Sequence, residues 1–228
     1  MDTIYLEGYE RFAYEEAADG AALDKHTQHL AILAVLIGCG GVDEYRHMLD
    51  RALKDGFSPV STKEIVYQAT AYLGMGRVRP FLAATNGVMQ ARGVSLPLPD
   101  QSTTSPKTRR EKGTAAQVAI FGEGMRDFWQ KSAMNRWLAA HCFGDHYTRT
   151  GLTLAERELI TFCFLYAQGG CEPQLMSHIT GNFNVGNDAE LLQKAVYRCV
   201  PWIGYPRSLN ALACIQKAIQ RQEDERHG

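Results

Sequence analysis

Three absences limit what this chain of 228 residues can be. Its 24 Lys and Arg balance 25 Asp and Glu, so no net field draws it to nucleic acid or an anionic membrane. The longest apolar run, Leu30 to Cys39, covers only about half of a bilayer span. The N-terminus carries Asp2 and Glu7 where a secretory signal has a basic segment before an apolar one. We therefore expect a cytoplasmic protein with no nucleic-acid partner and no membrane partner.

Cysteine is sparse as well. The six cysteines form no Cys-x-x-Cys pair and are too few for a disulfide scaffold, so we expect reduced thiols. His26 and His29 have the spacing of metal ligands on a helix, but the sequence shows no evident Cys or carboxylate partner for them. We expect no metal and no cofactor.

Strand patterns are also lacking, because β-branched residues are scattered and no run alternates. Apolar residues instead recur at helical spacing, which predicts an all-α fold. Ser61 and Glu64 have the spacing of a capping box and predict the start of one helix. The predicted helices cover residues 4–19, 23–38, 43–54, 61–72, 78–91, 114–130 with a break near Gly122, 134–143, 154–168, 171–184, 188–202 and 206–221.

Residues 92–113 differ from the rest of the chain, since they contain three prolines, several Ser and Thr and a basic cluster, with no apolar periodicity. Such a composition is typical of a linker or surface loop. It divides the chain into an N-terminal helical unit at 1–91, the linker, and a C-terminal unit at 114–228.

The two units are related by an internal repeat. A shift of 130 or 131 residues pairs Gly38 with Gly169, His47 with His178, Gly56 with Gly186, Val66 with Val196, Tyr67 with Tyr197, Gly74 with Gly204 and Arg77 with Arg207. Agreement at so many special residues in one order predicts two homologous helical units of about 65 residues each.

The stretch 171–186 has the clearest chemical pattern. Cys171, Gln174 and His178 fall on one face of the predicted helix, and Pro173 suits its first turn. A thiol at a helix N-terminus lies at the positive end of the dipole, so we expect the pKa of Cys171 to be lowered. The alternative is an ordinary amphipathic helix with a buried Cys and a hydrogen-bonded His.

Both repeats contain short motifs in one order. In the second repeat they are Phe143-Gly144-Asp145-His146-Tyr147-Thr148-Arg149 before Leu152, Arg157-Glu158-Leu159, Gln174-Leu175-x-x-His178, and Gly204-Tyr205-Pro206-Arg207 with Asn210-Ala211. In the first repeat they are Glu44-Tyr45-Arg46-His47 and Ala52-Leu53-x-x-Gly56. These motifs resemble the carboxymuconolactone decarboxylase family, which includes the alkylhydroperoxidase D proteins. The resemblance covers residues 24–91 and 152–221 and implies two tandem helical repeats of that family.

The hydroperoxidase branch of the family implies a Glu, then Cys-x-x-Cys, then His. These positions correspond here to Glu158, Cys171, Gln174 and His178, so an amide replaces the second thiol. Dithiol chemistry needs a resolving thiol, which Gln174 cannot supply. The first repeat matches less well, because Gly40 and Asp43 occupy the thiol positions and Thr27 stands in the place of the Glu.

The decarboxylase branch implies different roles. Loss of CO₂ from a lactone acid needs an oriented carboxylate, a place for the developing negative charge and a proton donor. His178 is the expected acid/base and Glu158 its orienting partner, with Cys171 as a third candidate catalytic residue. The expected substrate-binding residues are Gln174, Arg207, Arg149 and Tyr197, although Arg207 as a helix cap and Tyr197 as a core residue are alternatives. Glu44 and His47 are the counterparts in the first repeat.

Three functions therefore remain open at this point. The first is a lyase acting on a carboxylated lactone or ring compound in aromatic catabolism, and the second is a thiol peroxidase that uses Cys171. The third is a family member that binds a small molecule without catalysis. Because single-repeat members of the family are generally hexamers, the resemblance implies a homotrimer of two-repeat chains.

Overall fold

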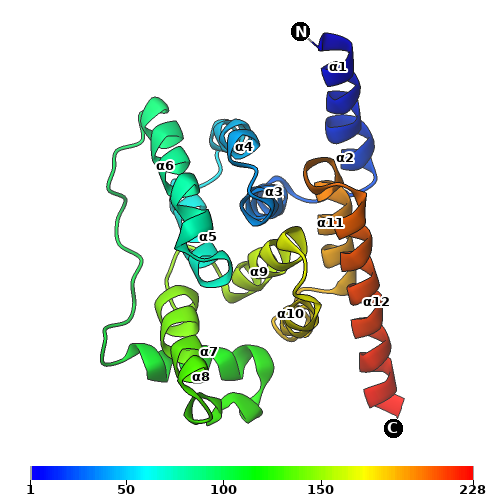
Figure 1. Ribbon diagram of the computed structural model, residues 1–228. Coiled ribbons are helices and arrows are strands. Elements are labelled where there is room, and N and C mark those ends of the chain that lie inside the picture. The colour runs from blue at the N-terminus through cyan, green and yellow to red at the C-terminus, as the bar shows by residue number, and fades with distance from the viewer. Residues whose placement is uncertain (1, 228) are drawn as a thin grey trace.

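The computed structural model describes residues 2–227, and all regular structure within them is helical, which confirms the all-α prediction (Figure 1). The chain opens with α1 (Thr3–Arg11), a short π-helical segment η1 (Phe12–Glu16) and α2 (Ala17–Asp19). These run on from one another over the range predicted for the first helix. None of the described helices is both long enough and apolar enough to cross a membrane.

The first repeat follows as α3 (Lys25–Cys39), α4 (Val42–Lys54), α5 (Pro59–Leu73) and α6 (Met75–Ala91). The prediction of a capping box at Ser61 is wrong, because α5 already begins at Pro59. Its N-cap is Ser58, whose side chain accepts from the Ser61 amide at 3.3 Å. Pro59 at the first helical position explains the earlier start, since its fixed φ suits the helix and it has no N–H to leave unpaired.

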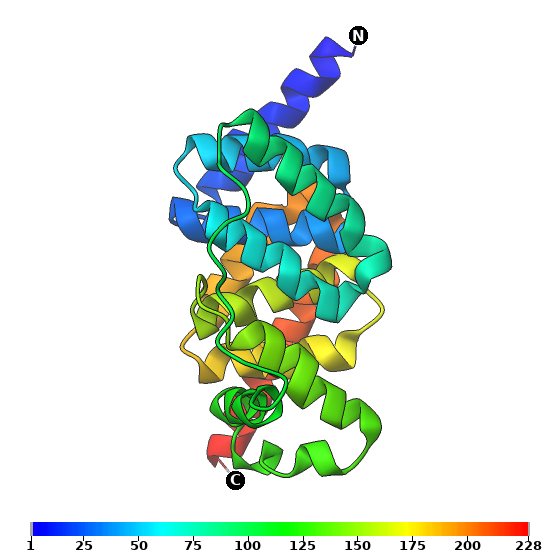
Figure 2. The same cartoon turned by 90° about the vertical axis from the view of Figure 1, so that its left-hand side faces the viewer.

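An insertion separates the two repeats. Residues 92–108 carry no regular structure and run along the outside of the helices (Figure 2). The predicted linker is too long at its end, because α7 (Arg109–Phe121) already begins at Arg109. Two 3₁₀ turns follow, η2 (Glu123–Met125) and η3 (Phe128–Gln130), and then α8 (Ala133–Trp137), which continues as the π-helix η4 (Leu138–Tyr147).

The second repeat contains α9 (Leu154–Gln168), α10 (Glu172–Asn184), α11 (Ala189–Ile203) and α12 (Tyr205–His227). A full capping box opens α9: Thr153 accepts from the Glu156 amide at 3.3 Å, while Glu156 accepts from the Thr153 amide at 2.6 Å. Cys171 is the N-cap residue of α10, as the position of Pro173 predicted.

The two repeats share one hydrophobic core. α3 and α9 pack against each other at its centre, and both are buried along most of their length (Figure 1). The repeats also interlock, since α5 of the first packs on α9 and α11 of the second packs on α3. Each fully buried Leu, Ile or Phe in this core contributes about 1.5–3 kcal/mol to folding. Neither repeat alone would cover its central helix.

The structure fixes the register between the repeats. The amide of Phe57 donates to the Ala52 carbonyl after α4, and Asn187 donates to Asn182 after α10, each at 2.9 Å. When α4 and α10 are aligned at these C-terminal ends, Met48 and not His47 takes the position equivalent to His178. Aligning the N-caps Asp24 and Thr153 likewise places His29, and not Thr27, opposite Glu158. The sequence pairing is therefore off by one residue at His178 and by two at Glu158. The difference arises because the loops that follow α3 and α9 differ in length.

Candidate functional site

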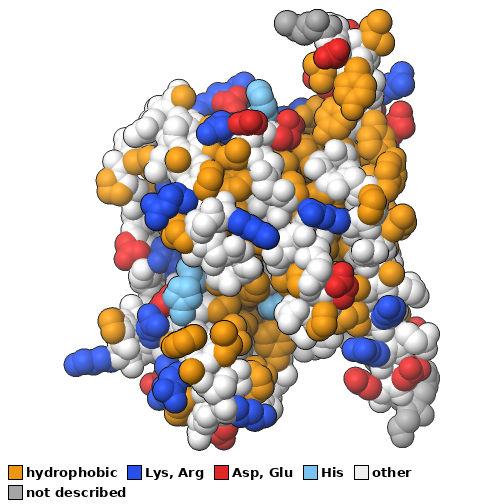
Figure 3. Space-filling model, in the orientation of Figure 1, with side chains coloured by type: hydrophobic (Ala, Val, Ile, Leu, Met, Phe, Trp, Pro, Cys, Tyr) orange, Lys and Arg blue, Asp and Glu red, His pale blue; other side chains and the backbone are white. Residues whose placement is uncertain are grey.

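A cavity of about 720 Å³ lies where the insertion meets both repeats. Figure 3 shows hydrophobic side chains gathered in the hollow between α7 and α8 on one side and α10 on the other. Its walls are mainly apolar and aromatic, and no Lys or Arg is among the described residues that line it. The lining residues are Ala71, Tyr72, Gln117, Phe121, Met125, Phe128, Leu138, Cys142, Phe143, Leu165, Gln168, Cys171, Gln174, Ser177 and His178.

His178 and Glu158 form the polar centre of this cavity. His178 Nδ1 lies 2.9 Å from Glu158 Oε2, and Glu158 is completely buried while His178 lines the cavity. An ionised carboxylate only accepts hydrogen bonds, so Nδ1 carries the proton and Nε2 is left for a ligand. The second oxygen, Glu158 Oε1, is buried without a hydrogen-bond partner within residues 2–227. Burying a carboxylate oxygen without a hydrogen bond costs folding free energy. Such groups are typical of functional sites.

The side-chain amides of Asn182 and Asn187 hold Glu158 and His178 in place. Asn182 Nδ2 donates to the carbonyls of Glu158 at 3.0 Å and of His178 at 2.7 Å, and so ties α10 to α9. Asn187 Nδ2 in turn donates to Asn182 Oδ1 at 2.7 Å, which orients that amide. The imidazole is also fixed by ring contacts, because Tyr72 and Phe121 lie edge-on to it with centroids 5.5 and 5.4 Å away. These contacts leave His178 little freedom to turn.

A glycine makes room for the pair. A Cβ on Gly181 would lie 2.5 Å from Glu158 Oε2 and 2.9 Å from Ile120 Cγ2 of α7. Only a residue without a side chain lets the carboxylate and α7 approach α10 this closely. The close approach of α7 places Phe121 on the imidazole.

The cavity wall next to His178 also carries a phenol and a thiol, those of Tyr72 and Cys142. Cys142 Sγ donates to Tyr72 Oη at 3.7 Å, and Tyr72 Oη lies 2.7 Å from Tyr147 Oη. Burial raises the pKa of Tyr72 well above its usual value of 10, so its hydroxyl keeps its proton. Burial also raises the pKa of Cys142 to about 12, which makes it a neutral thiol at physiological pH.

The expectation of a lowered pKa for Cys171 is wrong. Burial raises its pKa above the ordinary thiol value and outweighs the hydrogen bond from Gln168, and the Glu172 carboxylate raises it further. The thiol donates to the Leu165 carbonyl at 3.3 Å, which favours the protonated form. Cys171 also lines a second cavity of about 290 Å³ that it shares with Arg207. It is therefore positioned at the site without being activated.

We expect Cys171 to be a slow nucleophile. Its alkylation by iodoacetamide should keep rising above pH 9, because the thiolate fraction grows only beyond the raised pKa. The rate is measured residue by residue with mass spectrometry, with Cys39 as a second partly buried thiol and glutathione as a free one. A rate for Cys171 that levels off below pH 8 would show that the helix dipole dominates after all.

The predicted substrate-binding residues separate into two groups. Gln174 lines the main cavity beside His178, whereas Arg149, Arg207 and Tyr197 do not. Arg149 donates through Nε to both oxygens of Glu64 at 3.0 Å, and Arg207 donates to the Ala167 carbonyl beside the smaller cavity. The Tyr197 residue is 44% exposed on α11. The structure therefore brings together His178, Glu158, Cys171 and Gln174 but neither arginine.

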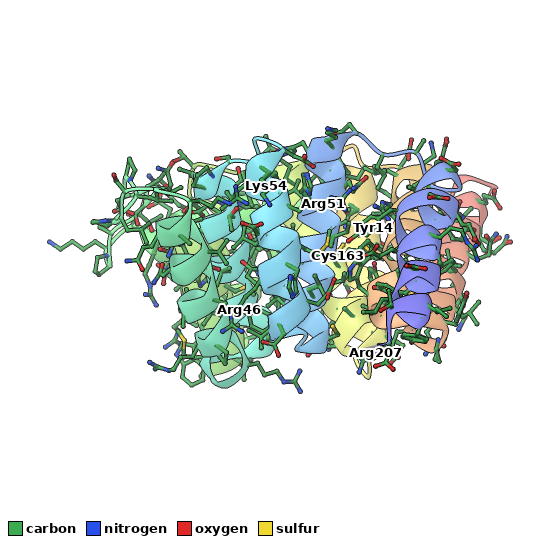
Figure 4. The ribbon with its side chains drawn as sticks, turned by 90° about the horizontal axis from the view of Figure 1, so that it is seen from above. Tyr14, Arg46, Arg51, Lys54, Cys163 and Arg207 are labelled. Carbon is green, nitrogen blue, oxygen red and sulfur yellow. The ribbon has the colours of Figure 1, made fainter. Side chains whose placement is uncertain are left out.

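The first repeat has no second copy of the pair. His47 is exposed and Glu44 is half-buried on α4, and neither lines a cavity described above. At the place equivalent to His178, Met48 Sδ accepts from Tyr14 Oη at 3.5 Å. The Arg51 guanidinium lies 4.1 Å from the Tyr14 ring centre (Figure 4). Side chains fill this place, and a sulfur replaces the imidazole.

Sequence reasoning missed the cavity residues that come from outside the second repeat. Tyr72 belongs to α5 of the first repeat, and Phe121 belongs to the insertion. The sequence signal that could have found Tyr72 is the repeat, in which Trp202 of α11 occupies the equivalent position. The ring centroid of Trp202 lies 6.5 Å from that of Tyr14. Because α5 of the first repeat packs on α9 of the second, Tyr72 reaches the cavity of the second repeat.

The model of one protein family matches both halves of this chain. It is described as the carboxymuconolactone decarboxylase family, and it covers residues 5–87 and 132–217. The chain belongs to this family. The two matched segments confirm the tandem repeat, and each starts before α3 or α9, so the helix that precedes each repeat is part of the family's unit. No curated protein matches the chain in sequence.

Proposed function

We propose that this carboxymuconolactone decarboxylase family member is a small-molecule lyase in which His178 moves a proton within an apolar cavity. One observation carries the proposal: Glu158 fixes Nδ1 of His178 at 2.9 Å, so that Nε2 is left to serve a molecule in the cavity. The expected substrate class is a carboxylated lactone or conjugated ring compound, in keeping with the family.

The proposed reaction needs no co-reactant. The bond between the ring carbon and the carboxylate breaks, CO₂ leaves, and the electron pair moves into the conjugated carbonyl. The imidazolium of His178 then delivers its Nε2 proton to the carbon, and the Glu158 carboxylate stabilises the charge on the ring while it is protonated. Apolar walls favour this step, because a carboxylate loses its hydration there and CO₂ does not.

The absence of arginine changes how the substrate is held. Arg149 and Arg207 were expected to grip the carboxylate, yet both are engaged elsewhere. Within the cavity, the amides of Gln168 and Gln174 and the His178 ring are among the polar groups that can hold a carboxylate. A weakly held carboxylate suits decarboxylation, since a strong ion pair would stabilise the ground state more than the transition state.

Peroxidase chemistry is the second candidate, because Cys142 and Cys171 both line the cavity. Burial raises the pKa of both thiols, however, and Gln174 occupies the place of the resolving thiol. A neutral thiol is a poor nucleophile towards a hydroperoxide. Binding without catalysis is the third candidate, and it leaves unexplained why a carboxylate is buried against His178.

The two enzyme proposals give opposite results in one experiment. Loss of a carboxymuconolactone and release of CO₂ are measured beside reduction of tert-butyl hydroperoxide by a dithiol, for wild type and Cys171→Ser. We expect lactone turnover within about threefold of wild type in the variant, and no thiol-dependent peroxidase activity in either protein. Hydroperoxide reduction that disappears in Cys171→Ser would support the peroxidase instead.

We also propose a homotrimer in the cytoplasm. Exposed apolar side chains support the assembly, because Ile4 and Tyr5 on α1 are 86% and 75% exposed. α1 stands away from the rest of the molecule, so that a neighbouring chain has access to this surface (Figure 1). Covering these side chains in an assembly would remove them from water.

A further inference from the structure

The insertion between the repeats builds much of the apolar wall of the main cavity. Apart from the Gln117 amide and the neutral Cys142 thiol, every lining side chain that it supplies is aliphatic or aromatic. These side chains are Phe121 from α7, Met125 from η2, Phe128 from η3, and Leu138 and Phe143 from η4. Within residues 2–227 the first repeat has no counterpart of α7, so the insertion shapes the cavity of the second repeat alone.

The cavity is large compared with a carboxymuconolactone. Its volume of about 720 Å³ is typical of sites that hold ligands of drug size, and a monocyclic lactone would leave most of it empty. Apolar walls without a partner lose dispersion contacts and keep their surface in water. The volume therefore favours a ligand with several rings.

The charge of the lining limits the ligand to one carboxylate. None of the described lining residues is Lys, Arg, Asp or Glu, and His178 is the one side chain among them that can become a cation. One carboxylate can lie against the imidazole and the amides of Gln168 and Gln174. A second carboxylate would lose its hydration against apolar side chains with no cation to offset the loss.

The aromatic side chains favour a flat molecule. Phe121 lies edge-on to Phe143 and to the His178 ring, with centroid distances of 5.9 and 5.4 Å. Tyr72 approaches the same imidazole edge-on at 5.5 Å. Further rings pack well against such a cluster in offset or edge-to-face contacts.

The apolar surface continues outside the cavity. Leu138 lines the cavity and is 36% exposed, and Met134, four residues earlier, is 61% exposed. Residues four apart lie on one face of a helix, so Met134 extends the wall that Leu138 begins. A ligand longer than the cavity would stay in contact with apolar side chains at this end.

We infer that the ligand of this cavity is a flat monocarboxylic acid of about three or four fused rings, and that Phe128 and Leu138 of the insertion determine this specificity. The inference rests on the proposed function and narrows its substrate class. The carboxyl group lies at His178, and the apolar body lies under the insertion. A small lactone with two carboxylates is a poorer ligand.

A series of aromatic acids tests the inference by binding alone. Benzoate, 2-naphthoate, 2-anthracenecarboxylate and 1-pyrenecarboxylate each add one ring to the one before. We expect the affinity of wild type to rise about three- to tenfold with each ring, because each ring buries further apolar area. A second carboxylate, in 2,6-naphthalenedicarboxylate, should weaken binding about tenfold relative to 2-naphthoate. Calorimetry and fluorescence titration measure these affinities.

A substitution in η3 and its neighbour link the preference to the insertion. Phe128→Ala should lower the affinity for 1-pyrenecarboxylate about fivefold and leave that for benzoate unchanged, since only the longer acid reaches this side chain. Trp129→Ala is the matched control, because Trp129 packs under the Arg110 guanidinium and lines a different groove. It should keep the wild-type series.

Leu138→Lys decides the matter should Phe128→Ala fail to fold. Leu138 is partly exposed, so a Lys there can keep its charge in water while it adds a cation to the cavity wall. We expect this variant to bind 2,6-naphthalenedicarboxylate more tightly than 2-naphthoate, which reverses the preference of wild type.

Other outcomes would overturn the inference. They are a flat or absent series, tighter binding of the dicarboxylate by wild type, equal effects of Phe128→Ala and Trp129→Ala, or an unchanged preference in Leu138→Lys. Failure of the proposed function is a separate result, because these acids carry no ring carbonyl to accept an electron pair and do not lose CO₂. A steep series with no turnover of a carboxymuconolactone or a fused-ring keto acid would refute the lyase alone.

Discussion

Replacing His178 by Gln is expected to lower the turnover of a carboxymuconolactone by about 10²–10⁴-fold, the usual contribution of a positioned general acid. Gln preserves a polar side chain next to Glu158 but cannot deliver a proton. The loss should appear in kcat, with KM changed little, because the proton is transferred after the substrate is bound. Steady-state kinetics on the folded variant measure it.

His47→Gln is the matched control. The sequence paired His47 with His178, yet His47 is exposed on α4 and Met48 takes the equivalent place. We expect His47→Gln to match wild type, and Glu158→Gln to give a loss smaller than that of His178→Gln. A comparable fall in kcat for the two histidine variants would mean that both repeats are active, contrary to the geometry.

Removing the Glu64 carboxylate is expected to have the largest effect on stability. Glu64 is 1% exposed and accepts from Arg157 at 2.9 Å and from Arg149 at 3.0 Å, so it joins α5 to α9. In Glu64→Leu the fully buried Arg157 loses the one carboxylate that pairs with it among the described residues, which costs about 3–5 kcal/mol. For a chain of this size the melting temperature should fall by about 10 °C.

An exposed ion pair provides the comparison for this prediction. Asp50 contacts Arg92 at 2.5 Å and Lys54 at 3.0 Å on the surface, where water screens both. Asp50→Asn should therefore shift the thermal transition much less than Glu64→Leu does. Similar shifts for the two variants in calorimetry would contradict the central role given to the buried pair.

Helix positions were predictable from the sequence wherever local signals decide them. Thr153 and Glu156 open α9 with their own side chains, and the helices predicted around Tyr45 and His178 lie close to α4 and α10. The start of α5 was misplaced because Ser58 and Ser61 are both good cap residues, and only the position of Pro59 separates them.

The insertion shows where local signals end. α7 begins with Arg109 and Arg110, and its amphipathic pattern is weak. It is held in place by backbone contact with η4: a Cβ on Gly113 would lie 1.8 Å from the Ala139 carbonyl oxygen, and one on Gly144 would lie 2.0 Å from that of Arg109. Such a contact between glycines distant in sequence leaves no periodicity to detect. The position of Phe121 in the cavity was therefore not predictable.

The candidate site was predictable in part for a similar reason. His178 and Glu158 belong to neighbouring helices of one repeat, so the motif spacing brought them together. The environment of Cys171 depends on burial, which the sequence does not give, and the expected direction of its pKa shift was therefore wrong. Tyr72 comes from α5 of the first repeat, and its place in the cavity follows only from the packing of the two repeats.

The tautomer of His178 tests the central claim most directly. Two-dimensional ¹⁵N–¹H spectra of the imidazoles, assigned by comparison with His178→Gln, show which ring nitrogen carries the proton in the neutral form. We predict that Nδ1 is protonated, on account of the Glu158 carboxylate at 2.9 Å, and that Nε2 is free to exchange a proton with a molecule in the cavity. A neutral ring that carries its proton on Nε2 would contradict the assignment of Nε2 as the nitrogen that exchanges the catalytic proton, and the proposal built on it.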